Sequence, residues 1–361
     1  MSTTAADMAR FMIAQLQLGQ YQGKRILSEA GTRLMQSRVF SPNPFINGSG
    51  LGWVEKYKNG HRLIWHGGLT VYFYSELYLL PEHDLGLFVV YNTQPPSDMM
   101  YGLMNQVMQQ YFPADLPEMS PTTEPDLTAY AGNYASMARS FTTWEKLYLL
   151  LSPNRVSATA SSLGFPQPEA DDTPSWLPAP QQPNVLRWSD EDALIHIKNT
   201  ADGDRYIIGP DPAGPDSKLG WAESQPVNLA VLGLCLLNFV AAIAWAVLCA
   251  LRRLQYADQG LPRLLAAALG LTNLALLAGL ADTLLLTSPY AMLAHLPWSL
   301  YLAMSLSLLT VALTAALLVA ISRRWPAWPR GLRLAYGAQA LLAVLFLTWL
   351  HFWNLIGFQV A

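Results

Sequence analysis

Apolar and polar residues alternate along residues 50–92 in the manner of short β-strands separated by turns. A Lys-Asn-Gly turn at 58–60 joins the first two strands, and a Pro-Glu-His-Asp turn at 81–84 joins the last two. The pattern predicts an antiparallel meander with His66 at the end of its second strand. The four predicted strands span residues 50–57, 62–66, 71–80 and 85–92.

The last third of the chain carries long apolar stretches instead. Each exceeds the roughly 20 residues that a helix needs to cross the hydrocarbon core of a membrane. The pattern therefore predicts four transmembrane helices within residues 226–358. They span residues 227–251, 264–286, 297–321 and 332–356.

Arginines flank these predicted helices unevenly. They occupy the first and third connecting loops, whereas residues 287–296, the second loop, contain neither Lys nor Arg. By the positive-inside rule the two Arg-rich loops are cytoplasmic. We therefore predict a multi-pass protein of the plasma (inner) membrane, with membrane lipid as a partner and residues 1–225 on the outer, periplasmic side. The arginines are Arg252, Arg253, Arg263, Arg323, Arg324, Arg330 and Arg333.

A further segment, residues 126–222, follows a proline-rich linker at 113–125. Short runs of strand-forming residues predict that it is a small all-β barrel or sandwich. The proline-rich stretch 165–183 is predicted to be a surface loop, and His196 to be structural. The strand-like runs span residues 146–151, 155–160, 185–188, 193–198 and 205–208.

Composition fits a membrane protein and excludes some functions. Hydrophobic residues make up 52% of the chain and charged residues only 13%, which is low for a soluble protein. The net charge is -3, and no basic patch exists beyond the arginines near the helices, so a nucleic-acid partner is not expected. Cys235 and Cys249 lie in one predicted helix, about 21 Å apart along its axis, and cannot pair with each other.

The candidate chemistry lies at His66-Gly67-Gly68, at the end of the second predicted strand. The glycines remove side chains from the strand, so that a ligand or another backbone can lie against it. The alternative is a histidine that merely caps the end of the sheet. His61 and His83 fall in predicted turns and are expected to be solvated. No cluster of His, Cys, Asp and Glu has metal-ligand spacing and no glycine-rich phosphate loop is present, so no metal or cofactor is predicted.

Six features stand in the order found in the serine beta-lactamase and penicillin-binding-protein family. The chain resembles the C-terminal half of that family over about residues 1–112, in its class C beta-lactamase, DD-peptidase and esterase branch. In addition, residues 127–134 resemble the opening of the small β-domains that often follow this hydrolase domain. The features are the helix starts at 2–12 and 26–30, the Gly-x-Gly-Trp strand at 50–53, the His-x-Gly triplet at 66–68, Pro-Glu at 81–82 and Tyr-Asn at 91–92.

Together the pattern and the resemblance predict a multidomain protein. Residues 1–112 would form a partial α+β fold of the beta-lactamase/transpeptidase type. A small all-β barrel or sandwich and an α-helical transmembrane bundle would follow it.

The resemblance also implies roles for three residues. His66 would hydrogen-bond the substrate carboxylate or a catalytic tyrosine, and Gly68 would let the substrate approach. The backbone N–H of Leu69 would donate to the oxyanion. The family usually has a glycine where this chain has Tyr72, which changes the expected shape of the substrate cleft.

The serine nucleophile of this family occurs in a Ser-x-x-Lys motif, and the chain contains none. The only Tyr-x-Asn sequence, at 57–59, falls in the predicted turn. We therefore expect the chain to be a fragment or a truncated gene model, and to be inactive as given. The six lysines are preceded, three positions earlier, by Tyr21, Trp53, Glu55, Thr143, Ile195 and Pro215.

Two functions remain open. The first is a membrane-anchored serine hydrolase that acts on a cell-wall peptide or on a small acyl substrate such as a β-lactam or an ester. The second is a non-enzymatic membrane protein whose outer domains bind a peptide or a protein partner. Asp282 and His351, near the outer ends of two predicted helices, either form a polar pair or reach interfacial water, and their end positions favour water. The oligomeric state is not indicated.

Overall fold

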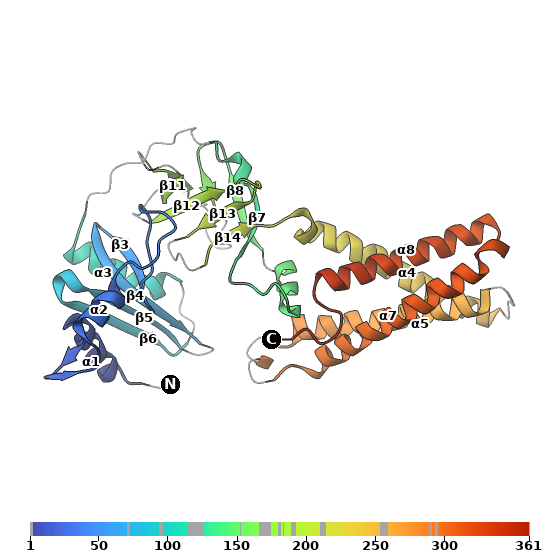
Figure 1. The fold of residues 1–361 in the computed structure, drawn as a ribbon, viewed down its shortest axis with the longest axis horizontal. Helices are drawn as coiled ribbons and strands as arrows, with labels where there is room; N and C mark the ends of the chain where they lie inside the picture. The colour runs from blue at the N-terminus through green and yellow to red at the C-terminus, as the bar shows by residue number, and fades with distance from the viewer. Residues whose placement is uncertain are drawn as a thin grey trace. The chain divides into compact units, whose positions relative to one another are not determined.

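The computed structural model divides the chain into two compact units (Figure 1). Unit 1 comprises Met1–Ala138 and Asn154–Leu219, and unit 2 comprises Arg139–Pro153 and Gly220–Ala361. The structure describes residues 3–70, 73–93, 97–114, 126–151, 153–165, 175–179, 182, 184–188, 193–209, 214–252, 259–288, 291–292 and 295–360.

The first part of unit 1 is built on a four-stranded antiparallel sheet in the order β3-β4-β5-β6. Asn59 and Gly60 have φ angles of 52° and 78°, which is the left-handed pair that a two-residue hairpin turn requires. The structure therefore contains the predicted meander, but β4 continues through both glycines to Leu69. The strands are β3 (Val54–Lys58), β4 (His61–Leu69), β5 (Tyr74–Leu80) and β6 (Leu85–Tyr91), with the 3₁₀ turn η1 (Pro81–His83) between the last two.

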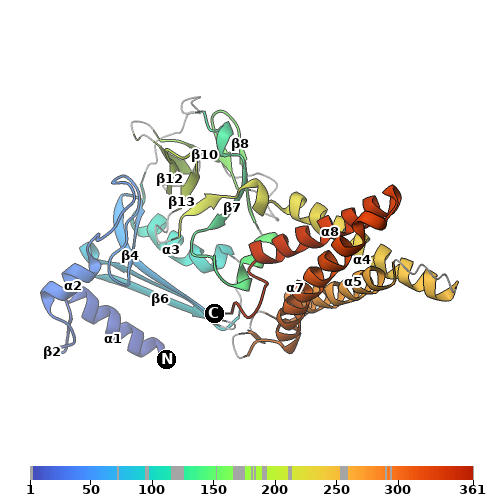
Figure 2. The same cartoon turned by 45° about the vertical axis from the view of Figure 1, so that its right-hand side comes forward.

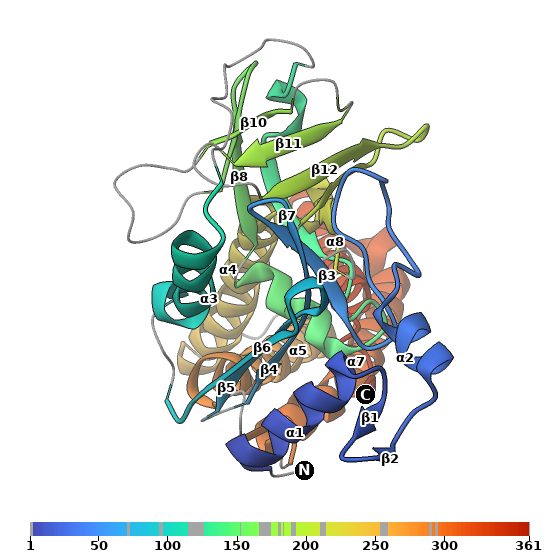
Figure 3. The same ribbon diagram turned by 90° about the vertical axis from the view of Figure 1, so that its left-hand side faces the viewer.

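Helices cover both faces of this sheet (Figure 3). Alternation along the strands sends Leu63 and Leu80 to one face, where they pack with Met108 of α3 (Ser97–Tyr111). The opposite face packs against α1. The other elements here are α1 (Ala5–Leu16), α2 (Glu29–Gln36) and the short ribbon of β1 (Gln20–Tyr21) and β2 (Lys24–Arg25).

Ser28 caps α2. Its hydroxyl accepts a hydrogen bond of 3.0 Å from the Gly31 N–H. Thr4 caps α1 in the same way, accepting from the Asp7 N–H at 3.2 Å. Each cap satisfies a backbone donor that the first turn of a helix leaves unpaired.

The second part of unit 1 is a closed eight-stranded barrel, in the order β10-β11-β12-β13-β14-β7-β8-β9. Leu127, Tyr134, Leu163 and Leu186 are among its fully buried core residues. A barrel, and not a sandwich, is therefore the architecture of this segment. Its strands are β7 (Gly132–Ser136), β8 (Asn154–Ala158), β9 (Leu163–Gly164), β10 (Ser175–Pro178), β11 (Val185–Trp188), β12 (Leu194–Asn199), β13 (Arg205–Ile208) and β14 (Asp216–Lys218), preceded by η2 (Thr128–Tyr130).

Two predictions about this region are wrong. Residues 165–183 are not all surface loop, because β10 pairs with both β9 and β11 and buries Trp176 in the barrel core. Residues 146–151 are not a strand either, since η3 (Trp144–Leu150) is a 3₁₀ helix.

Unit 2 is a bundle of four long helices (Figure 2), each long and apolar enough to cross a membrane. The last one ends at Phe352, four residues before its predicted end, where Asn354 adopts a left-handed φ of 55°. Cys235 and Cys249 are both free and buried. The helices are α4 (Gln225–Leu251), α5 (Gly260–Ala281) with the π-helical turn η6 (Asp282–Leu286), α7 (Trp298–Arg324) with η7 (Trp325–Ala327), and α8 (Arg330–Phe352), and η4 (Trp221–Glu223) precedes α4.

The insert 139–153, between β7 and β8, belongs to this helical unit. Trp144 is 1% exposed, and its backbone N–H donates to the Gln359 carbonyl at 3.0 Å. The Lys146 ammonium donates to the Phe352 carbonyl at 2.8 Å. These contacts with the end of α8 and the segment beyond it explain why the insert is helical and not a strand of the barrel.

Candidate functional site

The His-x-Gly triplet lines a cavity of about 330 Å³ on the α1 side of the sheet. His66 and Gly68 point to the same face because they are two residues apart on β4. Ser75 and Leu77 face them from β5, which pairs with β4. The remaining lining residues are Met8, Phe11, Met35, Gly52, Trp53, Gly67 and Phe88.

His66 lies at the rim of this cavity. Its side chain is exposed, and the ring makes no hydrogen bond to any residue that the structure describes. In a sheet-capping role we would expect the ring to bond to a neighbouring strand. His66 therefore lines the cavity without a hydrogen bond to any described strand, and its role as a ligand-facing residue stays a prediction.

Steric contacts disfavour a side chain at both glycine positions. A Cβ atom at Gly68 would lie 2.6 Å from the Ser75 hydroxyl oxygen. A Cβ atom at Gly67 would lie 2.7 Å from the indole ring of Trp65. Both distances are shorter than an ordinary contact, so a side chain at either position would force the Ser75 or the Trp65 side chain to move.

Leu69, the third predicted site residue, is placed differently. Its side chain is 70% exposed and does not line the cavity. A role for its backbone N–H as an oxyanion donor stays a prediction. Tyr72, which departs from the family pattern, lies outside the described residues.

A buried carboxylate lies on the opposite face of the same strands. Glu76 pairs with Gly67 across the sheet and is fully buried. One of its oxygens accepts hydrogen bonds from the indole N–H of Trp65 and, at 3.0 Å, from the hydroxyl of Tyr78, while Oε1 has no hydrogen-bond partner among the described residues. The sequence analysis did not single out Glu76. The signal was present, since alternation in β5 aligns it with Tyr78 and Leu80 on a buried face.

His196 has the structural role that the sequence predicts. It is 9% exposed in the barrel, and its Nδ1 lies 2.9 Å from the Asn184 carbonyl oxygen. Burial lowers the pKa of His196, outweighing the opposing effect of the Asn184 hydrogen bond, and the charge of Lys198 adds to the lowering. The neutral imidazole is thus the form that the fold holds.

The polar pair suggested for the helical unit is not formed. Asp282 and His351 are both described, and neither an ion pair nor a hydrogen bond joins them. His351 is exposed and Asp282 is partly exposed.

Residues 1–107 match the family model described as Beta-lactamase. The family model thus shows that this segment is similar to the beta-lactamase family. The match covers the sheet, α1, α2, the cavity and His66, so it agrees with the resemblance carried by the sequence motifs. A comparison with curated proteins found no match.

Solved structures give more distant similarities. The octameric penicillin-binding protein homologue from Pyrococcus abyssi is 17% identical, with 60% of this chain and 47% of that chain covered and a TM-score of 0.25. SurE is 15% identical, with 58% and 47% covered and a TM-score of 0.35. SurE with D-Leu is 14% identical, with 57% and 48% covered and a TM-score of 0.34. The chain spans about half the length of each.

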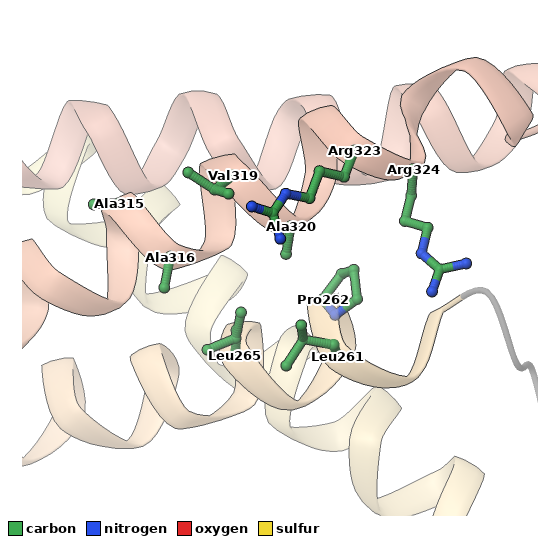
Figure 4. A pocket seen from close by; sticks show the side chains of 9 residues that line it. All are labelled: Leu261, Pro262, Leu265, Ala315, Ala316, Val319, Ala320, Arg323 and Arg324. Atoms are coloured by element: carbon green, nitrogen blue, oxygen red, sulfur yellow. The ribbon is translucent and has the colours of Figure 1, made fainter.

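A second cavity, of about 540 Å³, lies between α5 and α7 in the helical unit. Figure 4 shows Arg323 and Arg324 at one end of it and Ala315 and Ala316 at the other. The remaining lining residues are the apolar Leu261, Pro262, Leu265, Val319 and Ala320. The cavity is therefore apolar along its length, with two guanidinium groups at one end.

Proposed function

We propose that this protein is a membrane-anchored relative of the serine hydrolases in which His66 and Gly68 form the substrate-side wall of an acyl-transfer site. The observation that carries the proposal is the cavity on the α1 side of the sheet. There an exposed histidine and a side-chain-free strand lie within a segment that matches the beta-lactamase family. A β-lactam, a cell-wall peptide or an ester with a carboxylate would suit an imidazole at this rim.

Acyl transfer also needs an activated nucleophile. Residues 1–361 contain no Ser-x-x-Lys, so we infer that this chain binds acyl ligands without forming a covalent intermediate. Incubation of the purified chain with a fluorescent penicillin, followed by denaturing electrophoresis, should give no labelled band. A stoichiometric band would overturn this inference.

Non-covalent binding is tested with the same ligand. Fluorescence anisotropy should show weaker binding to His66→Ala than to the wild-type chain, by about tenfold if one charged hydrogen bond of roughly 1.4 kcal/mol is lost. Leu69→Ala is the matched control because it keeps the backbone N–H and alters only an exposed side chain. Equal affinity of wild type and His66→Ala would remove His66 from the site.

The missing motif equally favours a second function, a non-enzymatic receptor whose outer domains bind a peptide or a protein partner. The two functions are separated on the native protein, captured through a C-terminal tag introduced at its gene. An acyl adduct with the penicillin would support the hydrolase. Reversible binding without any adduct would support the receptor.

We further propose that the four helices span the plasma membrane with residues 1–225 outside. The arginines Arg323, Arg324 and Arg330 beside the α7–α8 connection support this orientation. Because both native cysteines are buried, single introduced cysteines can report sidedness. In intact cells an impermeant maleimide should label Asp202→Cys and not Ala327→Cys, and the reverse pattern would invert the topology.

Membrane lipid is the partner that we propose for the cavity in Figure 4. An acyl chain would lie along its apolar walls, and a lipid phosphate would meet Arg323 and Arg324. Native mass spectrometry with added phosphatidylglycerol should show less bound lipid for the Arg323→Ala, Arg324→Ala double variant than for Arg330→Ala. Equal binding by the two variants would contradict the assignment.

A further inference from the structure

Three potential metal ligands meet at the end of the sheet opposite the His-x-Gly triplet. They are His61, Glu82 and His83, and their ligand atoms all lie within 4.8 Å of one another. They are the one group of three such ligands found among the described residues. Their spacing along the chain gives no hint of this, since His61 is about twenty residues from the other two.

Strand register brings them together. In the β4–β5 ladder Trp65 pairs with Tyr78 and Ile64 with Leu79. Continuing the same antiparallel register to the first residue of β4 places His61 opposite Glu82, in the η1 turn that follows β5. The hairpin turn before β4 and the turn after β5 thus lie together at one end of the sheet.

The ring nitrogens of His61 and His83 are nearly as far apart as two nitrogens that bind one metal ion. His83 Nε2 lies 3.1 Å from His61 Nδ1. Two nitrogens bound to one tetrahedral Zn²⁺ at about 2.0–2.1 Å are about 3.3 Å apart. A small adjustment of the rings would therefore replace their mutual hydrogen bond with two metal–nitrogen bonds.

Neighbouring elements hold the rings in place. Phe112 packs against both, with ring centroids 5.0 Å from His61 and 4.6 Å from His83. The Asn59 amide donates to the carbonyls of Phe112 at 2.9 Å and Met108 at 3.3 Å, tying the hairpin turn to the end of α3. The C-terminal end of a helix carries partial negative charge, which also favours a bound cation.

We propose that His61, Glu82 and His83 bind one Zn²⁺ ion. Two imidazole nitrogens and one carboxylate oxygen are a donor set that suits zinc, whereas Ca²⁺ and Mg²⁺ prefer all-oxygen sites. Three protein ligands leave a fourth position for water or for a ligand from a binding partner. The start of β4 is roughly 16 Å from His66 at 3.3 Å per residue, so this site is separate from the proposed acyl-binding cavity.

The test measures zinc binding to the full chain in detergent, purified through a tag that contains no histidine. Isothermal titration with ZnCl₂ should give one ion per chain for the wild type. The ion should be lost in His61→Ala and in His83→Ala, and Glu82→Gln should bind it more than about tenfold more weakly, since even outer-shell changes cost 10–100-fold. His66→Ala removes a histidine from the same strand and should retain the wild-type affinity.

Circular dichroism of each variant without metal shows whether it is folded. If either histidine variant fails to fold, the site is tested with Co²⁺ instead. The visible absorption spectrum of bound Co²⁺ reports its coordinating atoms, and it is compared between the wild type and Glu82→Gln. A tetrahedral spectrum that changes in Glu82→Gln supports the site. Absence of one-to-one binding to the wild type, or undiminished zinc binding by folded His61→Ala and His83→Ala, would overturn the proposal.

Discussion

At the scale of single residues, the buried carboxylate of Glu55 holds together segments that are distant in sequence. It is 4% exposed and lies 2.5 Å from the Nε atoms of both Arg38 and Arg62. Burial raises the pKa of Glu55, but the hydrogen bonds and charges of Arg62 and Arg38 outweigh it, so the pKa is held below its ordinary value of 4.5. The folded state therefore favours the ionised form.

Glu55→Gln should destabilise unit 1 by about 3 kcal/mol, because it leaves two guanidinium groups without their common partner. A group whose pKa is lowered by folding contributes stability that is lost on acidification. We therefore expect wild-type stability to fall as the pH drops below about 4.5, and the variant to lose less over that range. Urea unfolding of both proteins at pH 7 and pH 4 measures this.

Glu29→Gln is the control, because its ion pair with Arg33 is more than half exposed on both sides and should matter little. If Glu55→Gln were no more harmful than Glu29→Gln, the buried cluster would not be stabilising. The sequence could not reveal this cluster. Its members are 7 and 17 residues apart, and only the β3–β4 pairing and the loop before β3 bring them together.

At the scale of secondary-structure elements, one asparagine joins two helices of unit 2. The indole N–H groups of Trp349 and Trp353 in and after α8 both donate to Asn228 Oδ1 of α4, each at 2.8 Å. The Asn228 amide donates in turn to the carbonyls of Ala222 and Ser224. Every polar group of this 3% exposed side chain is thus paired.

Asn228→Leu should loosen the α4–α8 contact, because two buried indole donors lose their acceptor at about 1–3 kcal/mol. Thermal unfolding in detergent, followed by tryptophan fluorescence, should show a lower midpoint and an altered emission maximum. Asn238→Leu is the control. Asn238 also lies in α4, but its side chain makes no hydrogen bond to a described residue. A midpoint for Asn228→Leu equal to that of Asn238→Leu would contradict the proposed link.

The sequence predicted those helices and strands whose structure is set by the local pattern of apolar and polar residues. Two-residue alternation and an Asn-Gly turn were sufficient for the meander, and apolar length was sufficient for the four helices. The pattern failed at 146–151, where alternating residues form a 3₁₀ helix. Leu147 and Leu149 are buried there, in a unit whose partner residues lie some two hundred positions later. A local pattern cannot report such a distant contact.

At the scale of the whole molecule, the two candidate sites also differ in whether the sequence could predict them. His66 and Gly68 could be found from the sequence because they are neighbours on one strand and belong to a recognisable triplet. His61, Glu82 and His83 could not, because strand register, and not spacing, unites them. The boundaries predicted at residues 112, 125 and 222 stay predictions. Within the segment 126–222, residues 139–153 and 220–222 belong to unit 2 and the others to unit 1.

This division leads to a prediction about coupling. Perturbations of residues that share no partners are usually additive. Glu55 lies in unit 1 and Asn228 in unit 2, so the Glu55→Gln, Asn228→Leu double variant should show the two single effects side by side. Hydrogen exchange followed by mass spectrometry resolves them, with faster exchange in β3 and β4 from the first change and in α4 and α8 from the second. Faster exchange of α4 and α8 in Glu55→Gln alone would contradict independent unfolding and show that the two units unfold together.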